Sequence, residues 1–246
     1  LFALQGLKEI SSTATLSAAR KLTNDPDIWV RSSAVEILGD EGGTEVLEEI
    51  RGYLESYDVP MKLAASAGLV KLGEEKYMKE VLDPLTHPIP DRRYQAIGHL
   101  GKIGSKKVLP HLVNLFDHSE TEMIFYSLKA LEGKATLDML PKLKALAKHT
   151  NPSVRQATAM AMSNLKEAEI DLIPLCADED GLTKLSAAVA LNRIGSDSCQ
   201  VVFDELLSHE DFKVRSSMAR VLGKTPIPER LRILTAALQD SHSRVR

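Results

Sequence analysis

The stretch "NPSVRQATAMAMSNL" (residues 151–165) begins like a helix, with Pro152 in its first turn and apolar residues at helical spacing after it. Its Val-Arg pair recurs at 30–31, 214–215 and 245–246. The position of the arginine, here the basic column, recurs along the whole chain at steps of 31 residues, with one step of 29. The basic column holds Arg31, Lys62, Arg93, Ile124, Arg155, Lys184, Arg215 and Arg246. Such regular recurrence indicates a repeating structural unit.

Two pairs of mainly apolar columns accompany the basic column. One pair lies twelve and eight residues before it, and the other lies three and seven residues after it. Because the members of each pair are four residues apart, each pair lies on one face of a helix. The unit is therefore a helix A followed by a helix B, each with one apolar face. A period in the low thirties built this way predicts an all-α fold, an α-solenoid of about eight two-helix repeats.

We expect residues 1–246 to form a single repeat array. Both ends fall inside a repeat, and neither resembles the polar capping repeat that closes a natural solenoid. The chain is thus expected to be a fragment of a longer protein.

Composition narrows the function classes. The net charge of −3 and pI of about 6.2 argue against general nucleic-acid binding. No apolar run reaches the 18 or more residues typical of a membrane-spanning helix, so no membrane insertion is expected. Cys176 and Cys199 match neither a disulfide framework nor a metal motif. We therefore expect reduced thiols and a cytoplasmic location.

The repeats resemble HEAT repeats, most closely the short bacterial type named from phycobilisome lyases. The motif is a short polar residue followed by "x-x-x-x-V-R-x-x-A-x-x-x-L-G", seen best in "DPDIWVRSSAVEILG" (25–39) and "HEDFKVRSSMARVLG" (209–223). The resemblance implies a ladder in which an Asp six residues before the basic column bonds to basic residues of adjacent repeats. The ladder residues would be Asp25, Arg31, Lys62, Arg93, Arg155, Asp178, Lys184, Arg215, Asp240 and Arg246.

Histidine replaces aspartate at four positions of that acidic column: His87, His118, His149 and His209. A shared metal is not expected, because packed helices lie roughly 8–10 Å apart whereas ligands lie within about 2.0–2.3 Å of their ion. We expect these histidines to hydrogen-bond the last carbonyls of helix A.

The residues predict no enzyme, cofactor or metal site. Deoxyhypusine hydroxylase, an enzyme family with this architecture, uses several His-Glu pairs to hold two irons, whereas this chain has only His209-Glu210. Alkylpurine DNA glycosylases use a basic, aromatic-lined face. The only tryptophan here is Trp29, and the net charge is negative.

The B helices should line the inner, concave wall. In the middle repeats their outward positions carry Leu63, Tyr94, Phe125, Tyr126, Lys129, Met160 and Val189. An exposed strip of this composition is typical of a surface that binds a protein or peptide. The alternative is that these side chains fill gaps between adjacent B helices. The leading function is therefore a non-catalytic scaffold for a protein or peptide. The alternatives are handling of a chromophore or its carrier protein, as in phycobilin lyases, and a regulatory elastic arm of a multidomain protein.

Overall fold

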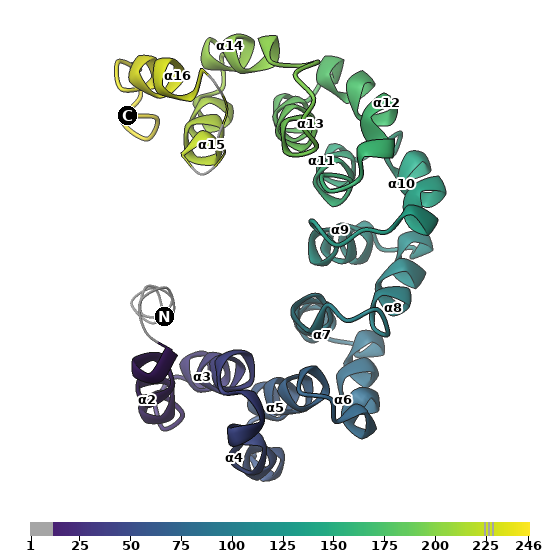
Figure 1. Cartoon of the computed structure of the whole chain (residues 1–246), viewed down its shortest axis with the longest axis vertical. Coiled ribbons are helices and arrows are strands. Elements are labelled where there is room, and N and C mark those ends of the chain that lie inside the picture. Colours follow the sequence, from purple (N-terminus) through teal and green to yellow (C-terminus); the bar gives the residue numbers. More distant parts are fainter. Residues whose placement is uncertain (1–11, 224, 226, 228) are drawn as a thin grey trace. The chain divides into compact units, whose positions relative to one another are not determined.

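A computed structural model describes residues 12–223, 225, 227 and 229–246. All regular elements in these residues are α- or 3-10 helices (Figure 1). The chain forms two compact units, Leu1–Leu112 and Val113–Arg246, which are taken in turn. None of the described helices is both long enough and apolar enough to cross a membrane.

The first unit alternates A segments with B helices. Its B helices are α3 (Ile28–Glu41), α5 (Val59–Lys71) and α7 (Pro90–Ile103). Its A segments are α2 (Ser12–Leu22), then η1 (Gly43–Val46), α4 (Leu47–Gly52) and η2 (Tyr53–Glu55), then η3 (Glu75–Tyr77), α6 (Met78–Leu82) and η4 (Asp83–Thr86). The short helix α8 (Leu109–Val113) reaches the boundary between the units.

The second unit repeats the pattern. Its B helices are α9 (Thr121–Ala130), α11 (Pro152–Ala161), α13 (Gly181–Arg193) and α15 (Phe212–Leu222). Its A segments are η5 (Asn114–Asp117), which continues α8, then η6 (Leu137–Met139) and α10 (Leu140–Leu146), then η7 (Lys166–Ala168), α12 (Glu169–Leu172) and η8 (Ile173–Ala177), then α14 (Val201–Leu207), then α16 (Arg230–Ala237).

The predicted apolar columns form the core. In the first unit Leu38, Leu69 and Leu100 are fully buried. In the second unit Leu131 and Met162 are fully buried too. Each B helix packs on the next within its unit, α3 on α5 on α7 and α9 on α11 on α13. The α-solenoid prediction is confirmed, because neighbouring hairpins share a core built from the same columns.

Several A segments change from α- to 3-10 geometry. Pro84 and Pro174 each lie at the second residue of a 3-10 helix, in η4 and η8. The segments η2 and η5 change in the same way without a proline, so proline favours the break without being required. The single 29-residue step falls at α12, which has only four residues.

Two glycines bring α3 and α5 into close contact. Gly39 lies inside α3, which continues to Glu41, and it is buried against α5. A Cβ at Gly39 would lie 2.8 Å from the Cα of Gly68. Gly39 is therefore required by backbone packing.

The arginines of the basic column close the loop between helices A and B. In every case Nη1 donates to the carbonyls six and five residues earlier, at 2.5 to 3.2 Å. The arginines that do so are Arg31, Arg93, Arg155, Arg215 and Arg246. Each guanidinium thus pairs two carbonyls that helix A and its turn leave without partners.

Two ladder rungs join adjacent repeats as predicted. Arg155 donates from Nε and Nη2 to both carboxylate oxygens of Asp178 at 2.7 Å, and both side chains are nearly buried. Arg215 holds Asp240 in the same way, at 2.7 and 3.0 Å. Such bidentate pairs are among the stronger hydrogen-bonded contacts in proteins.

The ladder prediction is wrong at other positions. Arg31 binds Asp58, which lies two residues beyond the column position Ser56. Lys184 pairs with Glu205 of α14, outside the acidic column. Among the residues that the structure describes, Lys62 has no ion-pair partner. Asp25 accepts a hydrogen bond from the backbone N–H of Asp27. In these repeats the ladder is replaced by other contacts or is absent.

The role predicted for the histidine column is also wrong. The Nδ1 atoms of His87, His118, His149 and His209 accept the backbone N–H two residues later, at 3.0 to 3.1 Å. The side-chain oxygens of the aspartates and the serine in the same column do likewise. The physical reason is that unpaired N–H groups precede helix B. Where an arginine follows, it already pairs the nearby carbonyls.

The expected free thiols are paired instead. Cys176 in η8 and Cys199 just before α14 form a disulfide, with their Cα atoms 6.1 Å apart. They are 23 residues apart in sequence, but the end of one A segment meets the start of the next. The prediction of reduced thiols is therefore wrong, and the cytoplasmic location that it supported stays a prediction.

Replacing Gly39 with alanine should lower the free energy of unfolding by about 1–3 kcal/mol, because α3 and α5 must move apart. The matched control is Gly98→Ala on α7, where a Cβ meets no atom within 4 Å. That control should raise stability by about 0.5–1 kcal/mol, because alanine is the better helix former. Urea unfolding measures both, and equal effects of the two changes would contradict the close packing.

The Arg215–Asp240 rung predicts a pH dependence. Hydrogen bonds from the Arg215 side chain and the His242 backbone lower the pKa of Asp240 from 3.8 to about 2. The contribution of the Arg215–Asp240 pair to the stability of the fold is therefore complete above about pH 4. It is lost as the pH falls through about 2. Asp240→Asn should lower the free energy of unfolding at pH 7. The difference in this free energy between the variant and wild type should shrink between pH 4 and 2. Asp197→Asn, at an exposed carboxylate without a described ion pair, is the control. A pH-independent difference for Asp240→Asn would count against the rung.

Candidate functional site

An aromatic cluster lies on α9 in the second unit and consists of Phe125, Tyr126 and Lys129. The rings of Phe125 and Tyr126 meet edge to face, with centroids 5.3 Å apart and an interplanar angle of 71°. The Lys129 Nζ lies 5.4 Å from the Phe125 ring centroid, within the range of a cation–π contact. The four-residue spacing of Phe125 and Lys129 places them one helical turn apart.

The opposite side of α9 anchors the helix in the core. Met123, Ile124 and Leu128 are buried there. Ile124 occupies the basic column in this repeat and is buried in the core. Phe125 and Tyr126 are half-buried and Lys129 is exposed, so the cluster presents ring surface and a cation to solvent.

Met160 lies on α11, which packs against α9, and it is also half-buried. Four of the predicted binding residues, Phe125, Tyr126, Lys129 and Met160, thus lie on two adjacent B helices. Tyr94 is half-buried on α7 of the first unit, so the predicted strip is divided between the two units.

Leu63 and Val189 cannot serve as exposed binding residues. Leu63 is 5% exposed and Val189 is 1% exposed. Their helices, α5 and α13, are rich in Ala, Ser and Gly, and nine of 13 residues in each are buried. Small side chains let neighbouring helices approach closely, which accounts for the burial of both side chains.

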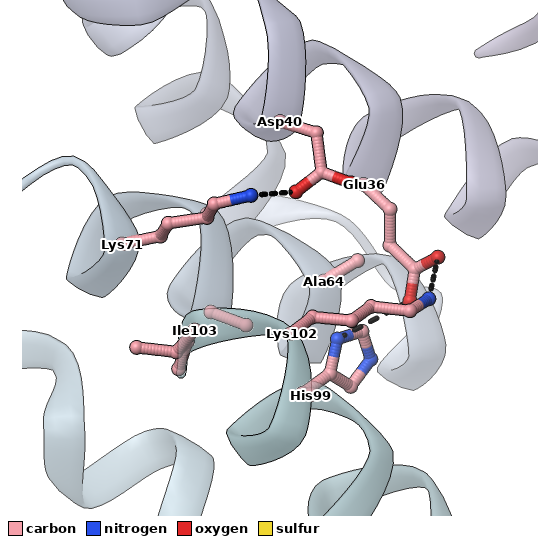
Figure 2. Close-up of a pocket in the computed structure, with 9 residues that line it drawn as sticks. Glu36, Asp40, Ala64, Lys71, His99, Lys102 and Ile103 are labelled. Atoms are coloured by element: carbon pink, nitrogen blue, oxygen red, sulfur yellow. Dashed lines mark hydrogen bonds and ion pairs between the residues drawn. The ribbon is translucent and has the colours of Figure 1, made fainter. Parts of the chain in front are cut away.

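In the first unit the B helices carry a cluster of ion pairs, here the Glu36 cluster, made by Glu36, Asp40, Lys71, His99 and Lys102 (Figure 2). Glu36 Oε2 accepts a hydrogen bond from Lys102 Nζ at 2.6 Å, and Oε1 lies 3.3 Å from His99 Nδ1. Lys71 pairs with Asp40. These pairs join α3 both to α5 and, two repeats along, to α7.

His99 is buried, and this desolvation lowers its pKa, although Glu36 acts in the opposite direction. The imidazole is therefore neutral at pH 7, and the charge on Glu36 is balanced by Lys102. Ala64, Ala67 and Gly68 lie between these side chains. Because its charges are paired over small residues, the cluster is suited to holding three repeats together.

A comparable ion pair between repeats two apart occurs in the second unit. Arg193 on α13 donates to Glu132 at 2.8 Å and thus reaches past the repeat that contains α11. Sequence reasoning missed both sets of pairs. The signal was present, because Asp40, Lys71 and Lys102 all lie nine residues after the basic column in consecutive repeats. In the described part of the chain, no group of three or more His, Cys, Asp or Glu side chains could hold a metal ion.

Comparison with known proteins agrees with the repeat assignment. Residues 170–246 match a family model for HEAT repeats, and residues 92–118 match one for the PBS lyase HEAT-like repeat. No curated protein gives a significant match.

Solved structures give three further likenesses. The complex of CpcE and CpcF of phycocyanin lyase from Nostoc sp. PCC7120 has a TM-score of 0.51 at 19% identity, covering 90% of this chain and 92% of that chain. Human deoxyhypusine hydroxylase has a TM-score of 0.39 at 12% identity, covering 95% and 88%. An engineered protein has a TM-score of 0.43 at 18% identity, covering 98% and 78%.

At this identity the phycocyanin lyase likeness shows the fold alone, and the other two likenesses are too weak to support an argument. The repeating columns, the helical hairpins and the two family models agree with one another. Residues 92–118 and 170–246 are thus similar to HEAT repeats, and the other described repeats show the same helical hairpins.

Proposed function

We propose that the chain is a non-catalytic scaffold that binds a protein or peptide on the B helices of its second unit. The observation that carries the proposal is the aromatic cluster of Phe125, Tyr126 and Lys129. Two rings and a cation stand partly in solvent on a helix whose other side is anchored in the core. Tyrosine and other rigid aromatic side chains are enriched among residues that dominate binding energy.

The composition of the cluster supports a peptide-like ligand. The half-buried ring faces of Phe125 and Tyr126 offer apolar area, while the Lys129 ammonium can pair with a polar group that a partner buries. Met160 on the adjacent helix α11 supplies an adaptable apolar side chain. The CpcE and CpcF structure is a complex of two proteins, a use of this fold that accords with the proposal.

The double change Tyr126→Ala with Lys129→Glu should weaken partner binding at least tenfold, because it removes ring area and reverses the charge. Partners are captured on the immobilised wild-type chain from a cell lysate and identified by mass spectrometry. The dissociation constant of each purified partner is then measured by calorimetry. The matched control is Lys148→Glu, an exposed lysine that follows α10.

Thermal unfolding of both variants shows whether the fold is kept. Tyr126 is only half-buried and Lys129 is exposed, so the melting temperature should change little. A folded double variant that binds every partner within twofold of wild type would refute the proposed surface.

A further inference from the structure

A groove opens in the first unit between α5 and the A segment that follows it. It has a volume of about 390 Å³. Its apolar lining comes from Leu54, Val59, Leu63, Tyr77 and Pro84, and its cation is Lys62. Leu63, which is 5% exposed, lies in the floor of the groove.

The groove lies where a ladder rung is missing. At Arg155 and Arg215 the guanidinium reaches a carboxylate of the next repeat. Here the basic column holds Lys62, and the acidic column of the next repeat holds His87. The imidazole of His87 is engaged with its own loop, where Nδ1 accepts the N–H of Ile89. Among the described residues, no hydrogen bond or ion pair therefore joins Lys62 to His87 of the next repeat.

The two walls of the groove carry charges of opposite sign. In the described part of the chain, Lys62 has no hydrogen bond or ion pair from its ammonium group. Across the groove, Asp83 is paired with Lys79, and Glu80 lies near the same lysine. A ligand carboxylate is therefore attracted to the α5 side and repelled from the α6 side.

Apolar surface at the mouth of the groove also lacks a cover. Val59 is 42% exposed, and Tyr57, two residues earlier, is fully exposed. Adjacent apolar side chains that stand in water next to a concave site are typical of a ligand-binding surface.

We propose that this groove binds a peptide segment of a protein partner that carries one aliphatic side chain followed by one carboxylate. The aliphatic side chain enters between Val59, Leu63 and Tyr77. The carboxylate binds Lys62. A second acidic residue is excluded by Glu80 and Asp83 on the opposite wall. This site lies in the first unit and is independent of the aromatic cluster on α9.

The probes are two blocked hexapeptides, GSLDSG and GSLNSG, which differ only in one carboxylate. Each is titrated into the ¹⁵N-labelled 246-residue chain while backbone amide shifts are recorded by NMR. The GSLDSG peptide should shift the amides of Val59, Lys62, Leu63 and Tyr77 to saturation. The GSLNSG peptide should bind at least fivefold more weakly. Equal affinities, or shifts that saturate elsewhere, would overturn the proposal.

A rung-building variant provides the structural test. Lys62→Arg with His87→Asp supplies the residue pair found at Arg155 and Asp178. The new guanidinium should pair with the new carboxylate instead of the peptide, which should weaken GSLDSG binding at least fivefold. The matched control, Lys184→Arg with His209→Asp, makes the same two changes in the second unit and should bind the peptide as wild type does. Lys62→Gln should reduce the affinity for GSLDSG to that for GSLNSG.

The urea concentration at which half of the protein is unfolded shows whether each variant is still folded. Because aspartate still accepts the loop N–H, as Asp178 does, the rung-building variant should unfold at or above the wild-type urea concentration. A folded rung-building variant that binds GSLDSG with wild-type affinity would refute the groove as the site.

Discussion

The contact of each column arginine with two carbonyls of its own A–B loop is the interaction that shapes the turn in the five repeats that carry an arginine there. The end of helix A and the start of helix B leave backbone groups unpaired a few residues apart. The arginine pairs carbonyls of the loop, and the side chain six residues before it pairs an N–H. Backbone groups at both ends of the turn are thereby hydrogen-bonded, which fixes the orientation of helix B relative to helix A.

The fold was largely predictable from the sequence because burial imposes a period on it. Leu38, Leu69 and Leu100 are buried at the same point of successive hairpins, and that regularity is visible without coordinates. The partners of loop groups were not predictable in this way. His149 could donate to a carbonyl or accept from an N–H, and the choice depends on which backbone groups Arg155 has already paired. The Cys176–Cys199 disulfide likewise depends on how successive A segments stack.

The candidate site was only partly predictable, because a helical wheel treats each helix as if it stood alone. Phe125, Tyr126 and Lys129 keep exposed surface on α9, where only four of ten residues are buried. Leu63 and Val189 hold outward wheel positions, yet small neighbouring residues let adjacent helices cover them. Exposure is therefore set by the size of side chains on neighbouring helices as much as by the position on the wheel.

The histidine column shows that loop closure and coupling between repeats are separable properties of the same position. Asp178 performs both, since it accepts the N–H of Asp180 and receives Arg155 from the preceding repeat. A neutral histidine has one acceptor nitrogen, and His87 uses it for the loop. His87 therefore keeps the turn intact while giving up the rung. A repeat protein can in this way omit the ion pair between two adjacent repeats and still keep the helical hairpin of each.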